Sequence, residues 1–333
     1  MNRRSAAVAL IVFAAVGITV AVFNHRVGKG YEKVSLRLQW IHQAQFAGFY
    51  VAKEKGFYRE QNIDLTIRPG GIGFNVPTLV ALEKEDFGIW VADQVLSSFD
   101  REKMPIRAIG TVYSRSLAGF MVRESSGILT PKDFVGKTVG VLHGFDTESI
   151  FLELLDRFHV DRSSIKEYPA TYNIVPFLHG DVDVWPAYVI NEPLSAKENH
   201  VEVRVLDPDE FGVHFYSDTL VVNEATLRNK RSLVERFLEA SERGWRYALS
   251  HTDEAVDIVL RFDPSLNRGH ELAMLNALAP YIRSTDPLFG MDPKVWESMA
   301  EVLYRQKQIS DTSSYLRLND FTIANEAHQK YHR

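Results

Sequence analysis

Short runs of alternating apolar and polar residues are interleaved with stretches of helical periodicity from residue 34 onward. Residues 34–38 and 63–67 alternate with a period of two, which is typical of a half-buried β-strand. Aromatic and small residues recur at helical spacing over 45–55 and stop at Gly56, a residue favoured just after a helix. Further predicted helices cover 76–84, 94–102 and 146–159, and further predicted strands cover 87–91, 106–112, 119–123, 138–142, 201–206 and 220–222. This alternation indicates parallel sheets with helices on both faces.

The pattern changes after residue 232 to almost uninterrupted helical periodicity. Helices are predicted over 232–250, 253–261, 270–282 and 293–308. No internal repeat is visible, and no linker is long enough to separate independent domains. We therefore expect two interlocked α/β lobes followed by a helical C-terminal tail.

The N-terminal residues have the layout of an export segment. Arg3 and Arg4 precede a stretch without charge, and residues 6–23 are apolar enough and, at 18 residues, just long enough to span a bilayer. An uncleaved inner-membrane anchor is favoured over a cleaved signal peptide because the residues that follow are poor cleavage positions; a buried core helix is the remaining alternative. The basic residues place the body after residue 30 outside the cytoplasm, in the periplasm.

Composition removes several classes of function. The 333 residues contain no cysteine, which excludes disulfides, thiolate metal sites, cysteine nucleophiles and a lipoprotein anchor. The formal net charge is −5, but residues 1–30 hold four basic side chains and no acidic one. Removing these four from the 38 basic residues leaves 34 against 43 acidic ones, a net charge of −9 for the body. An acidic body gives no support for nucleic-acid binding.

Signatures of catalysis and metal binding are missing from the sequence. There is no Gly-x-Ser-x-Gly elbow and no His-Glu-x-x-His pair. Gly136-Lys137-Thr138 resembles the end of a phosphate-binding loop, but Pro131 stands where the first glycine is required, so a turn entering a strand explains it better. We expect no enzyme, no metal and no cofactor.

Two segments carry the chemistry of recognition. Gly144, Phe145, Asp146 and Thr147 lie between a predicted strand and a predicted helix, where free backbone amides attract a ligand oxygen. Helix capping by Asp146 or Thr147 explains these residue types equally well.

The second segment runs from residue 183 to residue 193. It combines Trp185 and Tyr188 with Asn191 and Glu192, a set that suits a flat hydrogen-bonding heterocycle or a cation. The alternative is a buried aromatic pair beside a solvated carboxylate. A ligand site is favoured because the amide and the carboxylate are predicted to lie in a stiff loop bounded by prolines.

Motifs spread over residues 34–225 give the chain a family resemblance. The most specific stretch is 38–58, in which Gln39-Trp40 is followed by a small and aromatic segment and a helix ending in Gly56-Phe57-Tyr58. Further matches, in the same order, are Pro69-Gly70-Gly71, Ala92-Asp93, Asp133-x-x-Gly136-Lys137, Gly180-Asp181-Val182-Asp183 and Asn191-Glu192-Pro193. The sequence resembles the NMT1/THI5-like (SsuA/THI5) periplasmic substrate-binding proteins.

The resemblance implies a type II periplasmic-binding-protein fold. Two Rossmann-like lobes would be joined by two crossover strands, expected near residues 118–123 and 218–222, with a ligand clamped between them. The implied domains are a signal or anchor at 1–30, lobe 1 at 31–120 plus 222–333, and lobe 2 at 121–221.

The resemblance also implies a function and a set of site residues. The chain would be a monomeric solute-binding protein that delivers a thiamine-precursor pyrimidine, or alternatively a sulfonate, to an ABC permease and its ATPase. Trp40 would stack on the ring and Glu192 would bond its amino group, while Gln39, Asp93, Trp185, Tyr188, Asn191 and the 144–147 loop would complete the lining. A thiamine-pyrimidine synthase of the same family and a membrane-tethered sensor for a signalling partner are the alternatives. The missing cysteines and the export segment argue against the synthase, whose branch carries a cysteine-rich stretch.

Overall fold

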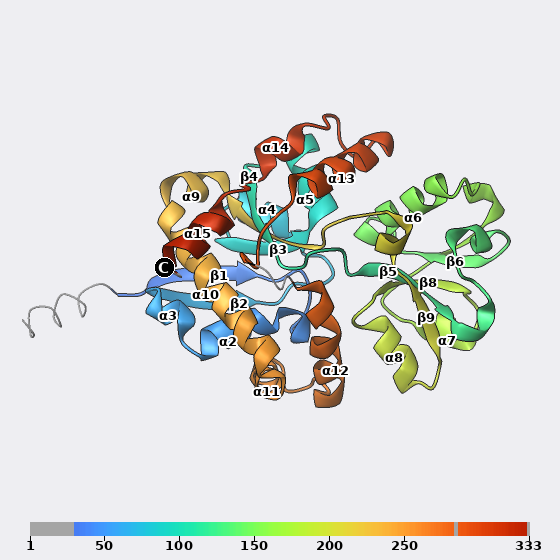
Figure 1. The fold of residues 1–333 in the computed structure, drawn as a ribbon, viewed down its shortest axis with the longest axis horizontal. Coiled ribbons are helices and arrows are strands. Elements are labelled where there is room, and N and C mark those ends of the chain that lie inside the picture. Colours follow the sequence, from blue (N-terminus) through green and yellow to red (C-terminus); the bar gives the residue numbers. More distant parts are fainter. Residues whose placement is uncertain (1–29, 283–285, 332–333) are drawn as a thin grey trace, which may run out of the picture.

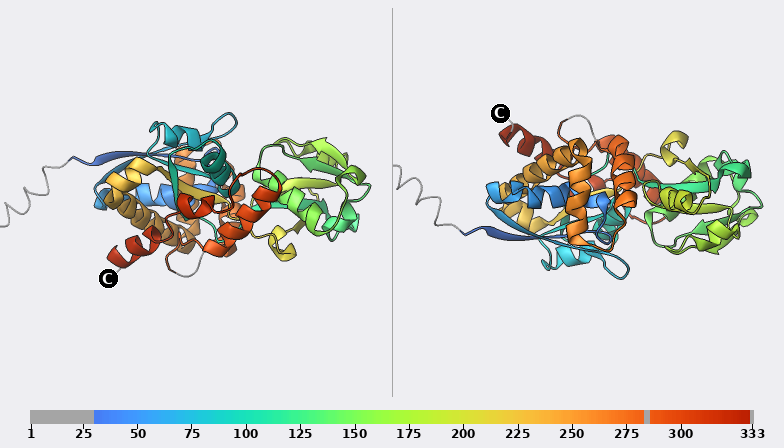
Figure 2. Two further views of the ribbon diagram at one scale, coloured as in Figure 1. Left: turned by 90° about the horizontal axis from the view of Figure 1, so that it is seen from above. Right: turned by 90° about the horizontal axis from the view of Figure 1, so that it is seen from below.

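Two five-stranded sheets organise the chain. The computed structural model describes residues 30–282 and 286–331. One sheet has the strand order β2-β1-β3-β10-β4 and the other has the order β7-β6-β8-β5-β9. Figure 1 shows the sheets side by side along the long axis, and Figure 2 shows the same separation from above and from below. We call the first sheet with its helices lobe 1 and the second sheet with its helices lobe 2.

The two sheets share one topology. The strands of lobe 1 are β1 (Glu32–Arg37), β2 (Ile63–Arg68), β3 (Phe87–Val91), β4 (Ile106–Thr111) and β10 (Asp218–Asn223). The strands of lobe 2 are β5 (Ala118–Arg123), β6 (Thr138–Val141), β7 (Lys166–Pro169), β8 (Val184–Tyr188) and β9 (Val203–Leu206). Three neighbouring strands of each sheet are parallel, and β10 or β5 runs antiparallel to both of its neighbours. The chain crosses to lobe 2 through residues 112–117 and returns through 207–217, which confirms the predicted two-lobed α/β fold.

Helices cover lobe 1 far more heavily than lobe 2. Lobe 2 carries α6 (Asp146–Arg157), α7 (Val175–His179) and α8 (Glu192–Glu198). The first part of lobe 1 carries α2 (Ala47–Glu54), α3 (Phe57–Glu60), α4 (Val76–Ala81) and α5 (Ala92–Arg101). The tail adds α9 (Glu224–Asn229), α10 (Arg231–Ser250), α11 (Thr252–Phe262), α12 (Arg268–Leu278), α13 (Pro293–Arg305), α14 (Ser314–Leu318) and α15 (Ile323–Tyr331). Short 3₁₀ turns, of which η1 (Ala44–Phe46) matters for the site, complete the chain, and the helical tail is as predicted.

The segment predicted as a stiff loop is different in the structure. Residues 184–188 form β8, a central strand of lobe 2, and Glu192 is the first residue of α8. Pro186 made a central strand unexpected because proline cannot donate to a ladder. Val184 is the one β8 residue recorded as paired with β6, and Gly140 of β6 makes room for the proline ring, because a Cβ atom there would lie 2.9 Å from Pro186 Cδ. The loop prediction was wrong, and strand β7 was not predicted.

Close packing of α2 against α10 holds the N-terminal part of lobe 1 to its tail. A Cβ atom added at Gly244 would lie 2.1 Å from the carbonyl oxygen of Gly48, so only glycine permits this approach. Beside the crossing, the buried rings of Phe49 and Trp245 meet edge to face with centroids 5.9 Å apart. This contact fixes the helix that directly follows the Gln39–Gln45 segment of the site described below.

No helix within 30–282 or 286–331 is both long enough and apolar enough to cross a membrane. The predicted export segment, residues 6–23, lies outside the described part of the chain.

Candidate functional site

A cavity of about 400 Å³ lies between the lobes. Lobe 1 lines it with residues that follow β1 and β2 and with the end of β3. Lobe 2 lines it with residues that follow β6 and β7, with β8 and with the start of α8. Both contributions come from the carboxyl ends of parallel strands, the place where open α/β sheets bind ligands. Of the predicted site residues, the cavity brings together Gln39, Trp40, Gly144, Phe145, Asp146, Thr147, Trp185, Tyr188, Asn191 and Glu192.

Amide side chains on the lobe 1 wall are bonded to a carboxylate behind it. Gln39 donates through Nε2 to the buried Asp218, and Gln45 Nε2 donates to the same carboxylate at 2.9 and 3.2 Å. Gln43 Nε2 in turn donates to Gln45 Oε1 at 2.6 Å. Burial raises the pKa of Asp218 to about 7, and these hydrogen bonds act in the opposite direction. The polar groups of this wall are thus largely engaged with one another.

Three aromatic rings meet across the mouth of the cavity. Trp40 of lobe 1 contacts Tyr172 of lobe 2 with ring centroids 4.4 Å apart, and Tyr172 meets Phe145 edge to face at 5.8 Å. A third ring does not fit between Trp40 and Tyr172, because stacked atoms need about 3.5–4 Å on each side. A planar ligand would therefore use the other face of Trp40 or displace Tyr172, whose side chain is 39% exposed.

Asp146 is the buried carboxylate of the lobe 2 wall. Its Oδ2 accepts a hydrogen bond from Tyr188 Oη at 3.1 Å, and its Oδ1 accepts one from the backbone amide of Thr147 at 2.9 Å. Burial, followed by the nearby charge of Asp93, raises the pKa of Asp146. The helix α6 begins at Asp146, and its N-cap residue Phe145 makes no side-chain cap. Asp146 is thus the first residue of α6 and not its N-cap, although it accepts the Thr147 amide, and it also lines the cavity.

Thr147 presents a buried hydroxyl to the cavity wall. Its side chain is 4% exposed, and Oγ1 has no hydrogen-bond partner within the described structure. Buried hydroxyls without a partner are uncommon because leaving one unsatisfied costs about 1–3 kcal/mol. Thr147 lines the cavity, and its Oγ1 is a buried hydroxyl beside it with no partner in the described part of the chain.

Asn191 and Glu192 form the polar corner at the start of α8. Glu192 accepts a bond from the Tyr188 amide at 2.7 Å and one from Asn191 Nδ2 at 3.1 Å. Each carboxylate oxygen has a second lone pair, so Glu192 keeps capacity for a ligand donor. Burial raises the pKa of Glu192, while the amide bonds and the charge of His270 oppose that shift.

Asp93 lies apart from the other predicted residues. It is fully buried at the start of α5 and is not part of the cavity lining. Its Oδ2 accepts a bond from Ser149 Oγ of α6 at 2.8 Å, and its Oδ1 accepts the amide of Gln94. Burial raises the pKa of Asp93. The Asp93 side chain therefore joins the two lobes outside the cavity lining. It influences the cavity only through its charge, which helps to raise the pKa of Asp146.

The sequence did not indicate several lining residues. These are chiefly Gln43, Gln45, Trp90 and Tyr172. Gln45 begins the predicted helix over 45–55, where nothing marks it as a ligand residue, and Tyr172 follows the strand β7, which the pattern does not predict. The position after a parallel strand would have been a signal for Tyr172 had β7 been recognised.

The cavity is free of basic side chains. None of its lining residues within the described chain is a lysine, an arginine or a histidine, whereas Asp146 and Glu192 are both present. The cavity is thus built from aromatic, amide, hydroxyl and carboxyl groups. These groups suit a neutral or cationic ring that donates hydrogen bonds.

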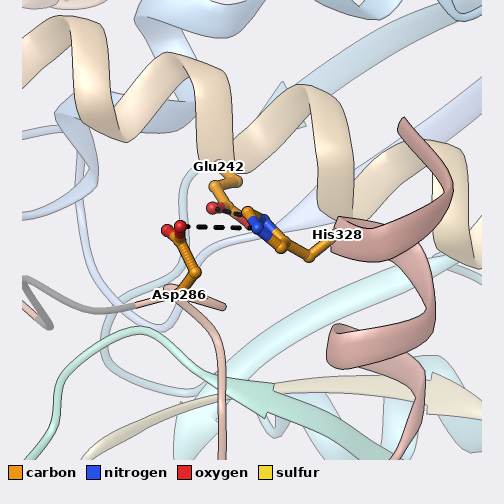
Figure 3. A group of neighbouring side chains, drawn as sticks. All are labelled: Glu242, Asp286 and His328. Carbon is orange, nitrogen blue, oxygen red and sulfur yellow. Dashed lines mark hydrogen bonds and ion pairs between the residues drawn. The ribbon is translucent and has the colours of Figure 1, made fainter. Parts of the chain in front are cut away.

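A second polar cluster lies away from the cavity, on the tail of lobe 1 (Figure 3). Ligand atoms of Glu242, Asp286 and His328 lie within 4.8 Å of one another. Arg246 of α10 forms ion pairs with both carboxylates, and His328 faces both as well. Because Arg246 and His328 already pair with both carboxylates, we assign the cluster to an ion-pair network that ties α15 to α10.

Relatives with curated names describe both enzymes and binding proteins. The 4-amino-5-hydroxymethyl-2-methylpyrimidine phosphate synthase of Legionella pneumophila is 25% identical over 284 residues, covering 84% of this chain and 88% of that protein. The riboflavin-binding protein RibY of Chloroflexus aurantiacus is 26% identical over 251 residues, covering 72% of this chain and 68% of that protein. Similarity at this level does not decide between catalysis and binding.

Solved structures and the family match place the chain more firmly. The periplasmic aliphatic sulphonate binding protein SsuA of Escherichia coli superposes with a TM-score of 0.70 at 14% identity, covering 88% of this chain and 98% of that one. This likeness establishes the periplasmic-binding-protein fold. The sequence model described as NMT1/THI5 like matches residues 43–255, more than half of the chain. The chain therefore belongs to the NMT1/THI5-like family.

Proposed function

We propose that this protein is an extracytoplasmic solute-binding protein that clamps a small amino-bearing heteroaromatic molecule, such as a thiamine-precursor pyrimidine, between its lobes. One observation carries the proposal: a cavity between the lobes has aromatic walls and two carboxylates, Asp146 and Glu192, and its described lining holds no basic side chain. Aromatic walls favour a flat ring. Carboxylates without a cationic partner favour a ligand that donates hydrogen bonds or carries positive charge.

The same chemistry disfavours a sulfonate ligand. A sulfonate would need cations or free amide donors, and the first turn of α6 offers few of these. The Thr147 amide is bonded to Asp146, the Gly144 amide to Glu148, and the Glu148 amide to the carbonyl of Phe145. A sulfonate buried beside Asp146 would also lose its hydration with no cation to replace it, at a place where burial already raises the pKa of the carboxyl group.

Binding is favoured over pyrimidine synthesis. In the synthase branch of the family, a histidine is consumed and pyridoxal phosphate is held by a lysine. Within the described lining of this cavity neither residue type is present, so no side chain there forms a Schiff base or supplies the histidine. The residues present do not fit that cofactor, and we propose no catalytic step.

We further propose that the protein hands its ligand to an ABC permease and ATPase from the outer face of the inner membrane. The apolar residues 6–23 behind Arg3 and Arg4 support export and retention as an anchor. Protease treatment of spheroplasts should digest the body from outside while the protein remains in the membrane fraction. Release of the body into the periplasmic fluid would instead indicate cleavage.

Calorimetric titration with three classes of ligand tests the binding proposal. We expect 4-amino-5-hydroxymethyl-2-methylpyrimidine to bind, its des-amino analogue to bind more weakly, and an alkanesulfonate of similar size to give no heat of binding. Mass spectrometry of the protein purified without refolding should detect a ligand of the first class. Binding of the sulfonate with no binding of any aminopyrimidine would overturn the ligand assignment. Turnover of pyridoxal phosphate with iron would overturn the choice of binding over catalysis.

A further inference from the structure

His270 lies outside the cavity but bridges the two lobes beside it. It belongs to the first turn of α12 in lobe 1, and its side chain is 14% exposed. Its Nδ1 faces Glu198 Oε1 at 2.9 Å, and its Nε2 faces Asn191 Oδ1 at 3.0 Å. Both partners belong to lobe 2, Asn191 just before α8 and Glu198 at its end. One imidazole ring therefore contacts side chains from both ends of α8.

The hydrogen bonds of its partners show what each ring nitrogen of His270 faces. Asn191 donates through Nδ2 to Glu192 Oε1, so its Oδ1 is the acceptor that faces His270. Glu198 as a carboxylate only accepts. Each imidazole nitrogen therefore faces an acceptor oxygen of lobe 2. The charges facing it are those of Glu198, Glu192 and Glu271, all acidic.

The next residue of the same helix contacts the opposite wall. Glu271 accepts the backbone amide of Ala44 at 2.5 Å, at the start of η1, which carries the cavity residue Gln45. The first turn of α12 thus reaches the lobe 1 wall through Glu271 and the polar corner of lobe 2 through His270. When the lobes come together, the contact of His270 with Asn191 would orient the Asn191 amide. Asn191 in turn donates to Glu192, so the Glu192 carboxylate would be oriented as well.

We propose that His270 is a positioning residue that couples closure of the lobes to the orientation of Glu192 in the ligand site. The path runs from α12 through the His270 ring to the Asn191 amide and then to the Glu192 carboxylate. The inference rests on the proposed function for the role of Glu192. The contact between the lobes itself does not depend on which ligand binds.

The first test measures closure without ligand. The chain has no cysteine, so cysteines introduced at the exposed positions Leu82 of lobe 1 and Leu129 of lobe 2 can be labelled selectively with a pair of fluorescent dyes. Single-molecule energy transfer should show a larger share of open molecules in His270→Ala than in the parent. The matched control is Arg268→Ala, which removes ion pairs to Asp253 and Asp257 within lobe 1 from the same helical turn. Identical distance distributions for His270→Ala and the parent would overturn the coupling to closure.

The second test separates positioning from a merely structural role. In His270→Ala the affinity for the aminopyrimidine should fall about tenfold, while that for the des-amino analogue should fall less than about threefold. Glu198→Gln keeps the Asn191 contact and should lower both affinities to a similar, smaller extent. An equal loss for both ligands in His270→Ala would overturn the positioning role. If the parent binds neither ligand, the proposed function fails, and the distance measurement still decides whether His270 links the lobes.

Discussion

The two walls of the cavity each have a buried carboxylate, but they use it differently. Behind the lobe 1 wall, Asp218 accepts bonds from Gln39 and Gln45 and a longer one of 3.3 Å from Ser217 Oγ. On the lobe 2 wall, among the residues that the structure describes, Asp146 accepts one side-chain bond, from Tyr188, and one backbone bond. The first carboxylate is occupied in holding its own lobe together, whereas the second retains capacity toward the cavity.

This difference assigns separate tasks to the lobes. With two of its amides bound to Asp218, lobe 1 offers the ligand mainly aromatic rings, those of Trp40, Phe74 and Trp90. Lobe 2 offers Asp146 and Glu192, and beside them lies the buried Thr147 hydroxyl, which has no partner among the described residues. We infer that lobe 1 supplies stacking with little chemical selectivity and that lobe 2 reads the polar groups of the ligand.

The largest expected effect concerns Asp218 and protein stability. Its pKa in the folded protein is about 7, above the usual 3.8. Between these two pH values the folded state keeps a proton on Asp218 that the unfolded state releases. The contribution of Asp218 to the free energy of unfolding is therefore fully present below about pH 4 and is lost as the pH rises through 7. The total loss is at most about 4 kcal/mol. Urea unfolding at pH 5 and pH 8.5 should show a lower free energy of unfolding at the higher pH. In Asp218→Asn this difference should shrink.

The control for this prediction is Asp311→Asn. Hydrogen bonds from Ser313 lower the pKa of the exposed Asp311 to about 2, so it is ionised in both states above pH 5. Its replacement should leave the difference between pH 5 and pH 8.5 unchanged. If Asp218→Asn behaves in the same way, Asp218 is ionised in the folded protein and the contrast between the walls has to be revised.

Trp40→Ala tests the task assigned to lobe 1. Loss of stacking should weaken ligand binding by roughly 1–3 kcal/mol. The loss should be similar for the aminopyrimidine and its des-amino analogue, because the ring contact does not involve the amino group. Trp40→Phe should restore much of the affinity in the same titration. A loss confined to the amino-bearing ligand would place polar recognition on lobe 1.

Glu192→Gln tests the task assigned to lobe 2. The amide keeps one acceptor oxygen but loses the charge, so the aminopyrimidine should bind about tenfold more weakly. The des-amino analogue should be nearly unaffected. Equal losses for both ligands would mean that Glu192 supports the start of α8 and does not contact the amino group.

The sequence indicated the site best where a motif coincides with a strand end. Trp40 follows β1 and Glu192 begins the helix after β8, and both line the cavity. Tyr172 escaped because β7 is a partly exposed edge strand with weak alternation, and only its pairing with β6 defines it. The family resemblance implied Asp93 as part of the lining, but its burial against Ser149 of the other lobe is a tertiary contact that no local pattern encodes.

The bridging role of His270 was also beyond sequence analysis. Its partners Asn191 and Glu198 are 79 and 72 residues away along the chain. They meet His270 only where α12 of lobe 1 packs against α8 of lobe 2. Local periodicity thus predicted the elements and the ends of strands. The contacts between lobes depend on how the two sheets face each other.

The smallest expected effect is also the sharpest test of the lobe 2 wall. Thr147→Val keeps the shape of the side chain and removes an Oγ1 that has no partner within the described structure. The free energy of unfolding without ligand should therefore stay the same or rise slightly, since no hydrogen bond is lost. If a ligand forms a hydrogen bond with Oγ1, Thr147→Val should weaken the free energy of binding by about 1 kcal/mol. Thr147→Ser, which keeps the hydroxyl, should bind like the parent. Unchanged affinity with unchanged stability would leave Asp146 and Glu192 as the polar contacts of this wall. A drop in the free energy of unfolding would show that Oγ1 is already hydrogen-bonded in the free protein. The polar groups of the lobe 2 wall would then be bonded within their own lobe, as those of lobe 1 are.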